Sequence, residues 1–135
     1  MTAPVTGSIS HVHAWHEFEN VNGADLLVYH AGLTDVSDGH RPFLEYSITF
    51  PGHGTIDILH RYVAPHMRRR GIGSAAYRAT EALAQSLAKM TQTEHRVTMT
   101  AAQPELLLQF LHRGYVPASE EDRSRLEKIL SGDPS

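Results

Sequence analysis

The stretch between Thr55 and Met90 constrains the fold of this 135-residue chain more than any other. It begins with an apolar-rich run, Ile56 to Val63, which is typical of a strand, and Pro65 forbids the simple continuation of that strand. Three arginines and a Gly-x-Gly turn follow, and then an amphipathic helical segment. Glycines let backbone N–H groups converge, and the first turn of a helix adds unpaired N–H groups and the positive end of its dipole. The order strand, glycine turn, helix therefore predicts an anion site and a phosphorylated ligand.

The spacing of the glycines decides which phosphate motif is present. A P-loop requires a Lys after its last glycine, and no Lys follows Gly71 or Gly73. A dinucleotide fingerprint requires a third glycine where this chain has Ala76. The pattern that fits is R-x-x-G-x-G, with Arg68, Gly71 and Gly73 as its fixed points.

Alternating hydrophobicity predicts β-strands in the first half of the chain. Phe43 to Phe50 alternates most clearly, with its apolar and polar side chains on opposite faces, and Leu26 to Leu33 also reads as a strand. The segments between the runs carry turn residues: Asn20 to Ala24, Thr34 to Arg41 and Pro51 to Gly54. We therefore expect an antiparallel meander of three or four strands that ends with the Ile56 to Val63 strand.

Helical periodicity follows the glycine turn. Apolar residues at steps of three and four predict a helix with one stripe against the sheet: Ile72, Ala76, Ala79, Leu83, Leu87 and Met90. The polar residues off that stripe should face water: Arg78, Glu81, Gln85 and Lys89. Arg96 to Thr100 is rich in β-branched residues, and a helical crossover precedes it, so it should be a strand parallel to the Ile56 strand.

Two further helices are predicted near the end of the chain. Pro104 and Gly114 have the positions of a start and a stop signal. Ser119 followed by Asp122 has the pattern of a cap, which predicts a last helix with a thin apolar face: Leu126, Ile129 and Leu130. The fold class that follows is α+β, with a mixed, mostly antiparallel sheet and packed helices.

Length and composition limit the class of protein. The chain has the size of one domain, which we expect to span residues 11–135 after a disordered N-terminus of residues 1–10. A net charge of -3 disfavours a protein that coats nucleic acid, and the lack of cysteine excludes disulfides and thiolate chemistry. The sequence has no run of about 18 apolar residues and no signal-peptide pattern, so a cytoplasmic protein without membrane association is expected.

A histidine-rich run near the N-terminus invites a metal interpretation. His11 and His13 are two residues apart and would share a strand face. However, the nearby Glu17 and Glu19 form no recognised ligand spacing, and the ten histidines are spread widely through the chain. We therefore expect a surface strand here and no metal.

The glycine-turn region resembles motif A of the GNAT acetyltransferase superfamily. Val63 and Pro65 form the V-x-P that precedes R-x-x-G-x-G, and a helix rich in small residues follows. Over residues 38–115 the chain is similar to small, single-domain YjdJ-like GNAT proteins, through P-F-L-E-Y-S-I-T-F, D-I-L-H-R-Y-V-A-P and R-R-G-I-G-S. The resemblance implies a GNAT-like domain with acetyl-CoA between the splayed Ile56 strand and its neighbour, and acyl transfer to an amine.

The resemblance also implies which residues bind the coenzyme. The backbone of Val63 would pair with the pantetheine arm and polarise the thioester carbonyl. The motif's Arg and the turn after it would hold the pyrophosphate: Arg68, Arg69, Arg70, Gly71, Ile72, Gly73 and Ser74. Arginine side chains add charge-assisted hydrogen bonds to phosphate. A solvated charge run, or a contact with nucleic acid, is the alternative interpretation of the three arginines.

Catalytic residues are less defined by the sequence. His60 matches the family's His before V-x-P, and an imidazole titrates near ~6.5, which suits a base. Alternation places His60 on one strand face with Ile56, Ile58 and Tyr62, so a core histidine is the alternative. Glu45 matches the family's F-x-E-Y position and could be a base, hold His60, or be a solvated carboxylate.

Two positions depart from the family pattern. Phe110 stands where larger GNAT enzymes often have a tyrosine general acid, and Ala101 lies nearest to the position of a cysteine that the small subgroup commonly carries.

The leading hypothesis is an N-acetyltransferase that moves an acetyl group from acetyl-CoA directly to a primary amine of a small molecule or protein. A non-catalytic acyl-CoA-binding or regulatory domain is the second hypothesis, and a nucleic-acid binder, disfavoured by the acidic charge, is the third. The oligomeric state stays open, with a homodimer as one option.

Overall fold

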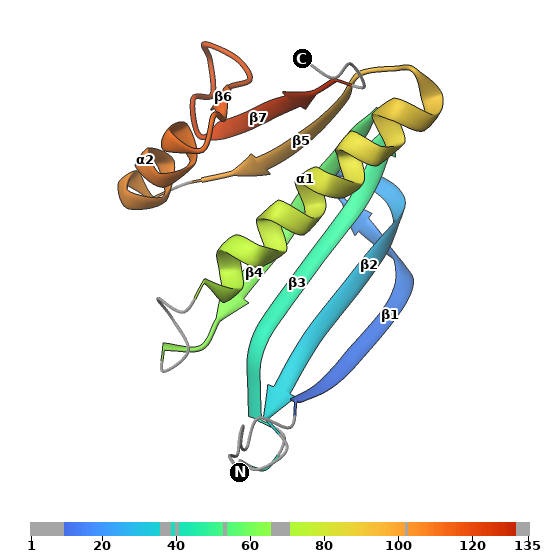
Figure 1. Cartoon of the computed structure of the whole chain (residues 1–135), viewed down its shortest axis with the longest axis vertical. Helices are drawn as coiled ribbons and strands as arrows, with labels where there is room; N and C mark the ends of the chain where they lie inside the picture. The colour runs from blue at the N-terminus through green and yellow to red at the C-terminus, as the bar shows by residue number, and fades with distance from the viewer. Residues whose placement is uncertain are drawn as a thin grey trace.

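A computed structural model describes residues 10–35, 39, 41–52, 54–65, 71–101 and 103–131 of the protein. They form one seven-stranded sheet and two helices (Figure 1). In chain order the elements are β1 (Ser10–Val21), β2 (Ala24–Asp35), β3 (Arg41–Gly52), β4 (Thr55–Val63), α1 (Ile72–Thr91), β5 (His95–Thr100), α2 (Pro104–His112), β6 (Val116–Pro117) and β7 (Arg125–Leu130). The predicted α+β class with a mixed, mostly antiparallel sheet is confirmed. Of the expected disordered N-terminus, residues 1–9 lie outside the described part of the chain, and Ser10 begins β1.

The strands lie in the order β1-β2-β3-β4-β5-β7-β6. β1 to β4 form an antiparallel meander, and β5 runs parallel to β4 after the α1 crossover, as the sequence predicts. β7 then pairs antiparallel with both β5 and β6. The β1–β2 hairpin turns at Asn22 and Gly23, which both have positive φ, as a two-residue hairpin loop of this type requires. This tight turn sets the β1–β2 register without a shift from Ser10↔Asp35 to Val21↔Ala24.

The prediction of a last helix is wrong, because Arg125–Leu130 is the strand β7. The cap pattern is used, but it closes a turn: the backbone N–H of Asp122 donates to Ser119 Oγ, and that of Ser124 donates to Asp122 Oδ1. β7 then fills the space between β5 and β6 and buries Leu126 completely. Pairing between distant segments decides this element, and a local cap pattern does not report such pairing.

The predicted apolar stripe of α1 is also partly wrong. Leu83 and Met90 are 40% and 80% exposed, and the residues that face the sheet are Tyr77, Thr80, Ala84 and Ala88. The small alanine side chains let the helix axis approach the sheet closely, although alanine contributes little to a hydrophobic pattern. Glu81, expected in water, is instead largely buried and accepts hydrogen bonds from Tyr115 and Lys128.

The hydrophobic core lies between α1, α2 and the strands β4, β5 and β7. Its buried members are Ile56, Ile58, Tyr77, Ala84, Val97, Met99, Ala101, Phe110, Tyr115 and Leu126. α1 runs across β3, β4, β5 and β7, whereas β1 and β2 extend to one side of it (Figure 1). Neither of the helices in the described ranges has the length and apolarity needed to cross a bilayer.

Candidate active site

A β-bulge in β4 decides which way its side chains point. The β3–β4 register shifts at this point, so that Ile48 pairs with Ile58 while the preceding residue, Ser47, pairs with His60. Cross-strand partners share a face and consecutive residues do not, so His60 lies on the opposite face from Ile58. The prediction that His60 shares a face with the buried isoleucines is therefore wrong. Simple alternation fails here because Leu59 is an extra residue in the strand.

β4 and β5 separate shortly after they pair. Their parallel register runs from Thr55↔Arg96 to Asp57↔Thr98, and β4 then continues to Val63 along β3. A cavity of about 230 Å³ lies in the opening, lined by both strands and by both helices: Ile58, Leu59, His60, Arg61, Tyr77, Met99, Thr100, Leu106 and Phe110. The side chain of Asp57 marks the start of the opening, where it accepts hydrogen bonds from Thr98 and Arg125. We call this space the strand cleft.

The glycine turn leads into the N-terminus of α1. Gly71 is the N-cap with φ 78°, a left-handed conformation, and the helix start has no side-chain cap. Ile72, Gly73 and Ser74 form the first helical turn, whose N–H groups have no partner within the helix. Tyr77 lines the strand cleft from the next turn, so the helix N-terminus is about 9 Å along the axis from that position. Arg68, Arg69 and Arg70 lie outside the described residues.

A second and larger cavity lies on the face of β1–β4 that is turned away from α1, which we call the far face. Its volume is about 640 Å³. One row of paired residues crosses it from strand to strand: Trp15, His30, Ser47 and His60. Leu59 and His60 line both this far-face cavity and the strand cleft. The bulge thus places an imidazole in the lining of both spaces.

The structure brings His60 and Glu45 together on the far face. Their nearest atoms, Nε2 and Oε1, are 4.0 Å apart, and both side chains are about half exposed. That separation is an ion-pair contact and too long for a direct hydrogen bond. A bridging water, or a small rotation of either side chain, would connect them. Of the other predicted residues, Val63 is at the end of β4 and is buried.

Tyr77 is a cleft residue that sequence reasoning missed. Its ring packs edge-to-face against Phe110 with 4.7 Å between centroids, and the guanidinium of Arg61 lies 5.2 Å from the Tyr77 centroid. Burial raises the pKa of the Tyr77 phenol above its ordinary value of 10.0, and the nearby Arg61 and Arg113 offset part of that rise. Tyr77 therefore keeps its proton at neutral pH. The cleft thus contains the phenol of Tyr77, next to Phe110, which has no hydroxyl group.

Two further tyrosines surround the same core. Burial raises the pKa of Tyr46, whose hydroxyl pairs with Thr80 Oγ1 at 2.6 Å, although that hydrogen bond acts in the opposite direction. Burial also raises the pKa of Tyr115, and its hydrogen bond to Glu81 raises it further.

Ala101 is packed in the core at 3% exposure, so the position nearest to the family's cysteine has a structural role here.

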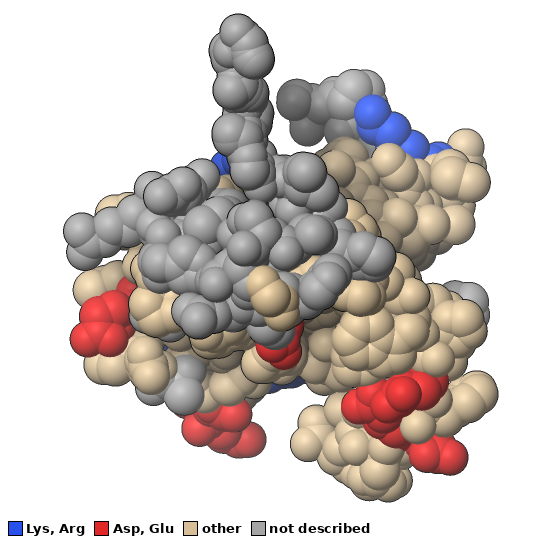
Figure 2. All heavy atoms as spheres, turned by 90° about the horizontal axis from the view of Figure 1, so that it is seen from below, with Lys and Arg blue, Asp and Glu red and all other residues tan. Residues whose placement is uncertain are grey.

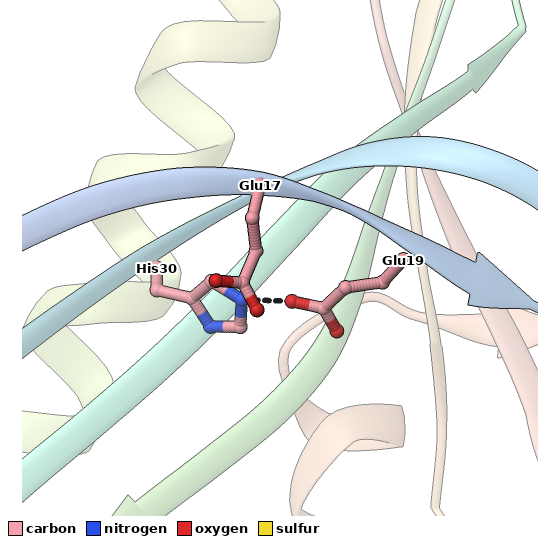
Figure 3. A group of neighbouring side chains, drawn as sticks. All are labelled: Glu17, Glu19 and His30. Carbon is pink, nitrogen blue, oxygen red and sulfur yellow. Dashed lines mark hydrogen bonds and ion pairs between the residues drawn. The ribbon is translucent and has the colours of Figure 1, made fainter.

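The structure also assembles a group of metal-ligating side chains that the sequence did not predict. Glu17 and Glu19 of β1 meet His30 of β2, and their ligand atoms all lie within 4.8 Å of one another (Figure 3). The sequence contains one signal that could have predicted this group, namely the turn residues Asn22 and Gly23 between β1 and β2. A two-residue loop at Asn22 and Gly23 sets the register that brings the His30 strand beside β1.

Comparison with solved structures identifies the fold. A tyrosine-to-phenylalanine mutant of the toxin AtaT, bound to the C-terminus of the antitoxin AtaR and acetyl-CoA, is 13% identical with a TM-score of 0.58, over 77% of this chain and 68% of that one. The KacTA–DNA complex is 12% identical with a TM-score of 0.60, over 76% and 67%. AtaT complexed with acetyl-methionyl-tRNAfMet is 11% identical with a TM-score of 0.59, over 76% and 70%. Neither a protein-family model nor a curated protein sequence matches the chain.

The chain therefore has the fold of the GNAT acetyltransferases. At these identities the likeness establishes the fold alone, and the YjdJ-like subgroup stays a prediction. Two of the neighbours are complexes with nucleic acid. The comparisons thus give no support to the expectation, based on net charge, that nucleic acid is disfavoured as a partner.

Proposed function

We propose that this protein is an N-acetyltransferase that moves an acetyl group from acetyl-CoA directly to a primary amine. The observation that carries the proposal is the position of His60, which lines both the strand cleft and the far-face cavity. A reaction between two bound molecules needs two spaces that meet at the reacting atoms. In this arrangement the cleft holds the thioester and the far-face cavity holds the amine.

The coenzyme would bind along the strand cleft with its pyrophosphate at the start of α1. The backbone N–H groups of the first turn have no partner within α1, and the positive end of the helix dipole favours an anion. A Cβ built on the left-handed Gly71 meets no described heavy atom within 4 Å, so this side of the turn has room for a phosphate. Arg68, Arg69 and Arg70 would add charge-assisted hydrogen bonds, and the edge of β4 up to Val63 would pair with the pantetheine arm.

The far-face cavity has the chemistry for a cationic amine. Its described lining includes the carboxylates of Glu19 and Glu45 and contains neither Lys nor Arg. Trp15 contributes an aromatic wall that suits the apolar stem of an alkylamine. Thr34 Oγ1 is buried in this lining and has no hydrogen-bond partner among the described residues, so it can pair with a polar group of the acceptor.

The reaction then needs one proton acceptor and one proton donor. His60, with Glu45 at 4.0 Å, would take a proton from the ammonium or the attacking amine, directly or through water. The amine nitrogen forms a bond to the thioester carbonyl carbon, and the bond from that carbon to sulfur breaks. Tyr77 would supply the proton for the departing thiolate, in place of the phenol that Phe110 lacks.

The first test is titration calorimetry of the protein with acetyl-CoA and with CoA. We expect micromolar binding of both ligands, and Gly71→Val should abolish it because the residue would have to leave its left-handed conformation. Gly23→Val is the matched control, because Gly23 also has positive φ and no described heavy atom within 4 Å of a built Cβ. Normal binding by a folded Gly71→Val protein would overturn the proposed coenzyme site.

The second test separates chemistry from binding. In an amine panel assayed by thiol release, His60→Ala and Tyr77→Phe should each lower the rate by about 10²-fold while the affinity for acetyl-CoA stays near wild type. If the rates of both variants equal that of the wild type, these residues have no catalytic role.

A non-catalytic acyl-CoA-binding domain is the second candidate. The packing of Phe110 and Ala101 in the core favours it, because neither side chain carries a proton for catalysis. Retained binding of acetyl-CoA with no transfer to any amine would select this function. A nucleic-acid ligand would instead show binding that falls steeply with salt.

A further inference from the structure

The β1–β2 hairpin gathers three metal-ligating side chains at one end of the far-face cavity. Glu17 and Glu19 alternate onto one face of β1, and His30 belongs to the same face because it pairs with Trp15. Figure 3 shows the two carboxylates and the imidazole turned toward one another. One carboxylate oxygen from each glutamate and one nitrogen of His30 lie within 4.8 Å of one another. We propose that these residues bind a divalent first-row transition metal.

The imidazole of His30 is held in the orientation of a metal ligand. Its Nε2 faces Glu19 Oε2 at 2.5 Å, and its Nδ1 is 2.7 Å from Ser47 Oγ on the neighbouring strand. The indole of Trp15 stacks on the ring, with 4.9 Å between centroids and 11° between planes. Histidine ligands are commonly fixed by a hydrogen bond at their second nitrogen. Ser47 and Trp15 therefore leave Nε2 pointing at the two carboxylates.

A cation would take the place of the direct contact between His30 and Glu19. Nε2 and Glu19 Oε2 would separate to admit the metal between them. A metal on Nε2 would leave Nδ1 to donate a hydrogen bond to Ser47 Oγ. The donor atoms of a tetrahedral zinc site are about 3.3 Å apart, so modest rotations of the glutamate side chains complete the geometry.

The charge and the donor types favour a transition metal. Two carboxylates give the cluster a charge of about -2 when His30 is neutral, which a divalent cation balances. Figure 2, the view from below, shows acidic side chains of the described residues in several separate places on the surface. A nitrogen ligand disfavours Mg²⁺ and Ca²⁺ and suits Zn²⁺, Co²⁺ and Mn²⁺. Three protein ligands also leave a position open toward the cavity for water or a further ligand.

The single tryptophan of the chain provides a direct readout. Co²⁺ is paramagnetic and should quench the fluorescence of Trp15 when it binds beside the stacked His30. Zn²⁺ does not quench in this way, and it should reverse the signal by competition. We expect saturable quenching at micromolar Co²⁺ and its recovery with Zn²⁺. The measurement needs no acetyl-CoA, so its outcome is independent of the proposed acetyl transfer.

Conservative variants identify the ligands. Glu17→Gln, Glu19→Gln and His30→Gln should each weaken Co²⁺ binding by at least about tenfold, and Ser47→Ala by about tenfold through loss of the Nδ1 contact. Glu17 is exposed, so Glu17→Gln should fold like the wild type. His16→Gln is the matched control, because His16 lies on the opposite face of the same strand beside Tyr29. Circular dichroism melting of each variant checks that loss of binding is not loss of the fold.

The histidine-rich run near the N-terminus is the alternative metal-binding location, because His13 and Trp15 both line the far-face cavity. His13→Gln should leave Co²⁺ binding within about twofold of wild type. If His13→Gln abolishes the quenching while Glu17→Gln and His30→Gln do not, the metal binds at the run and the proposed site is wrong. Absence of saturable quenching would mean that His30 and Glu19 form an ion pair only, which would also overturn the proposal.

Discussion

The two halves of the sheet differ in what covers them. In the helix-covered half, formed by β4, β5 and β7 with α1 and α2, apolar residues such as Ile56, Val97 and Leu126 are fully buried. In the β1–β3 half, large apolar side chains are in solvent, with Phe18 72% and Val12 65% exposed. The residues of the hydrophobic core come mainly from the helix-covered half. Both cavities include residues of β4, the strand that adjoins the β1–β3 half.

Charged groups follow the same division. In the helix-covered half, Asp57 is 4% exposed and pairs with Arg125 at 2.8 Å, and Glu81 is held by Tyr115 and Lys128. In the β1–β3 half, Glu19 and Glu45 line the far-face cavity. The difference indicates that one half supplies most of the stability, and that the other half presents polar groups to a ligand.

The largest expected effect is on the buried core of the helix-covered half. Ile56→Ala should lower the free energy of unfolding by about 2–5 kcal/mol, because it removes fully buried methylene groups and leaves a cavity. Phe18→Ala in the β1–β3 half should change it by less than about 0.5 kcal/mol, since most of that ring is already in water. Urea denaturation measures both values. Equal costs for the two substitutions would contradict the contrast between the halves.

The buried ion pair should be the next largest contribution. Arg125→Met leaves the Asp57 carboxylate buried with Thr98 as its remaining partner, and should cost about 3 kcal/mol. This is the lower end of the usual range, because the Arg125 side chain is one-third exposed. Arg96→Met is the control, since its pair with Glu127 is at the surface and should be worth less than about 1 kcal/mol. A stabilised Arg125→Met protein would show that hydrophobic packing replaces the pair without cost.

The three tyrosines that belong to α1 or hydrogen-bond to it should make the protein sensitive to alkali. Because burial raises the pKa of Tyr46, Tyr77 and Tyr115, the folded chain keeps protons that the unfolded chain loses above pH ~10. The stability that these groups contribute is complete below that pH and falls as the pH rises further. Each tyrosine adds up to about 1.4 kcal/mol per pH unit to the slope. Tyr115→Phe should remove one such contribution in denaturation curves measured between about pH 9 and pH 12, and an unchanged slope would argue against it.

The smallest expected effect is on local opening. Amide hydrogens of β1, an edge strand paired on one side by β2, should exchange faster than those of β5, which is paired on both sides. We expect protection factors at least about tenfold lower in β1, equal to about 1.4 kcal/mol of opening free energy. Hydrogen exchange followed by mass spectrometry makes the comparison, with β7 as the internal standard for a central strand. Equal protection in β1 and β5 would show that the two halves open together.

Sequence reasoning succeeded where local chemistry decides the structure. The Asn22–Gly23 turn, the alternation in β3 and the helical crossover through α1 are local signals, and they gave the meander and the parallel strand β5. Pro104 and Gly114 likewise delimit α2. For the candidate site, the sequence predicted the turn before α1 and the pair of Glu45 and His60, whose roles stay predictions.

The failures occur where distant segments decide the structure. β7 is a strand because β5 and β6 offer it hydrogen bonds, whereas its own sequence reads as a helix. The position of Tyr77 beside Phe110 depends on how α1 and α2 pack, which no spacing in the chain encodes. His30 joins Glu17 and Glu19 through strand pairing, so a search for ligands at fixed intervals passes over it.

The bulge in β4 has a consequence for insertions and deletions. Leu59 is one extra residue in a strand whose side chains alternate between two faces. Ile58 and His60 therefore lie on opposite faces, as they would if they were consecutive residues of a regular strand. Deletion of Leu59 would thus leave Ile58 toward α1 and His60 toward the far face, and would remove the residue that, with His60, lines both cavities. An alignment of β4 with a strand one residue shorter must place its gap at Leu59, because a gap one position later would remove His60 from the comparison.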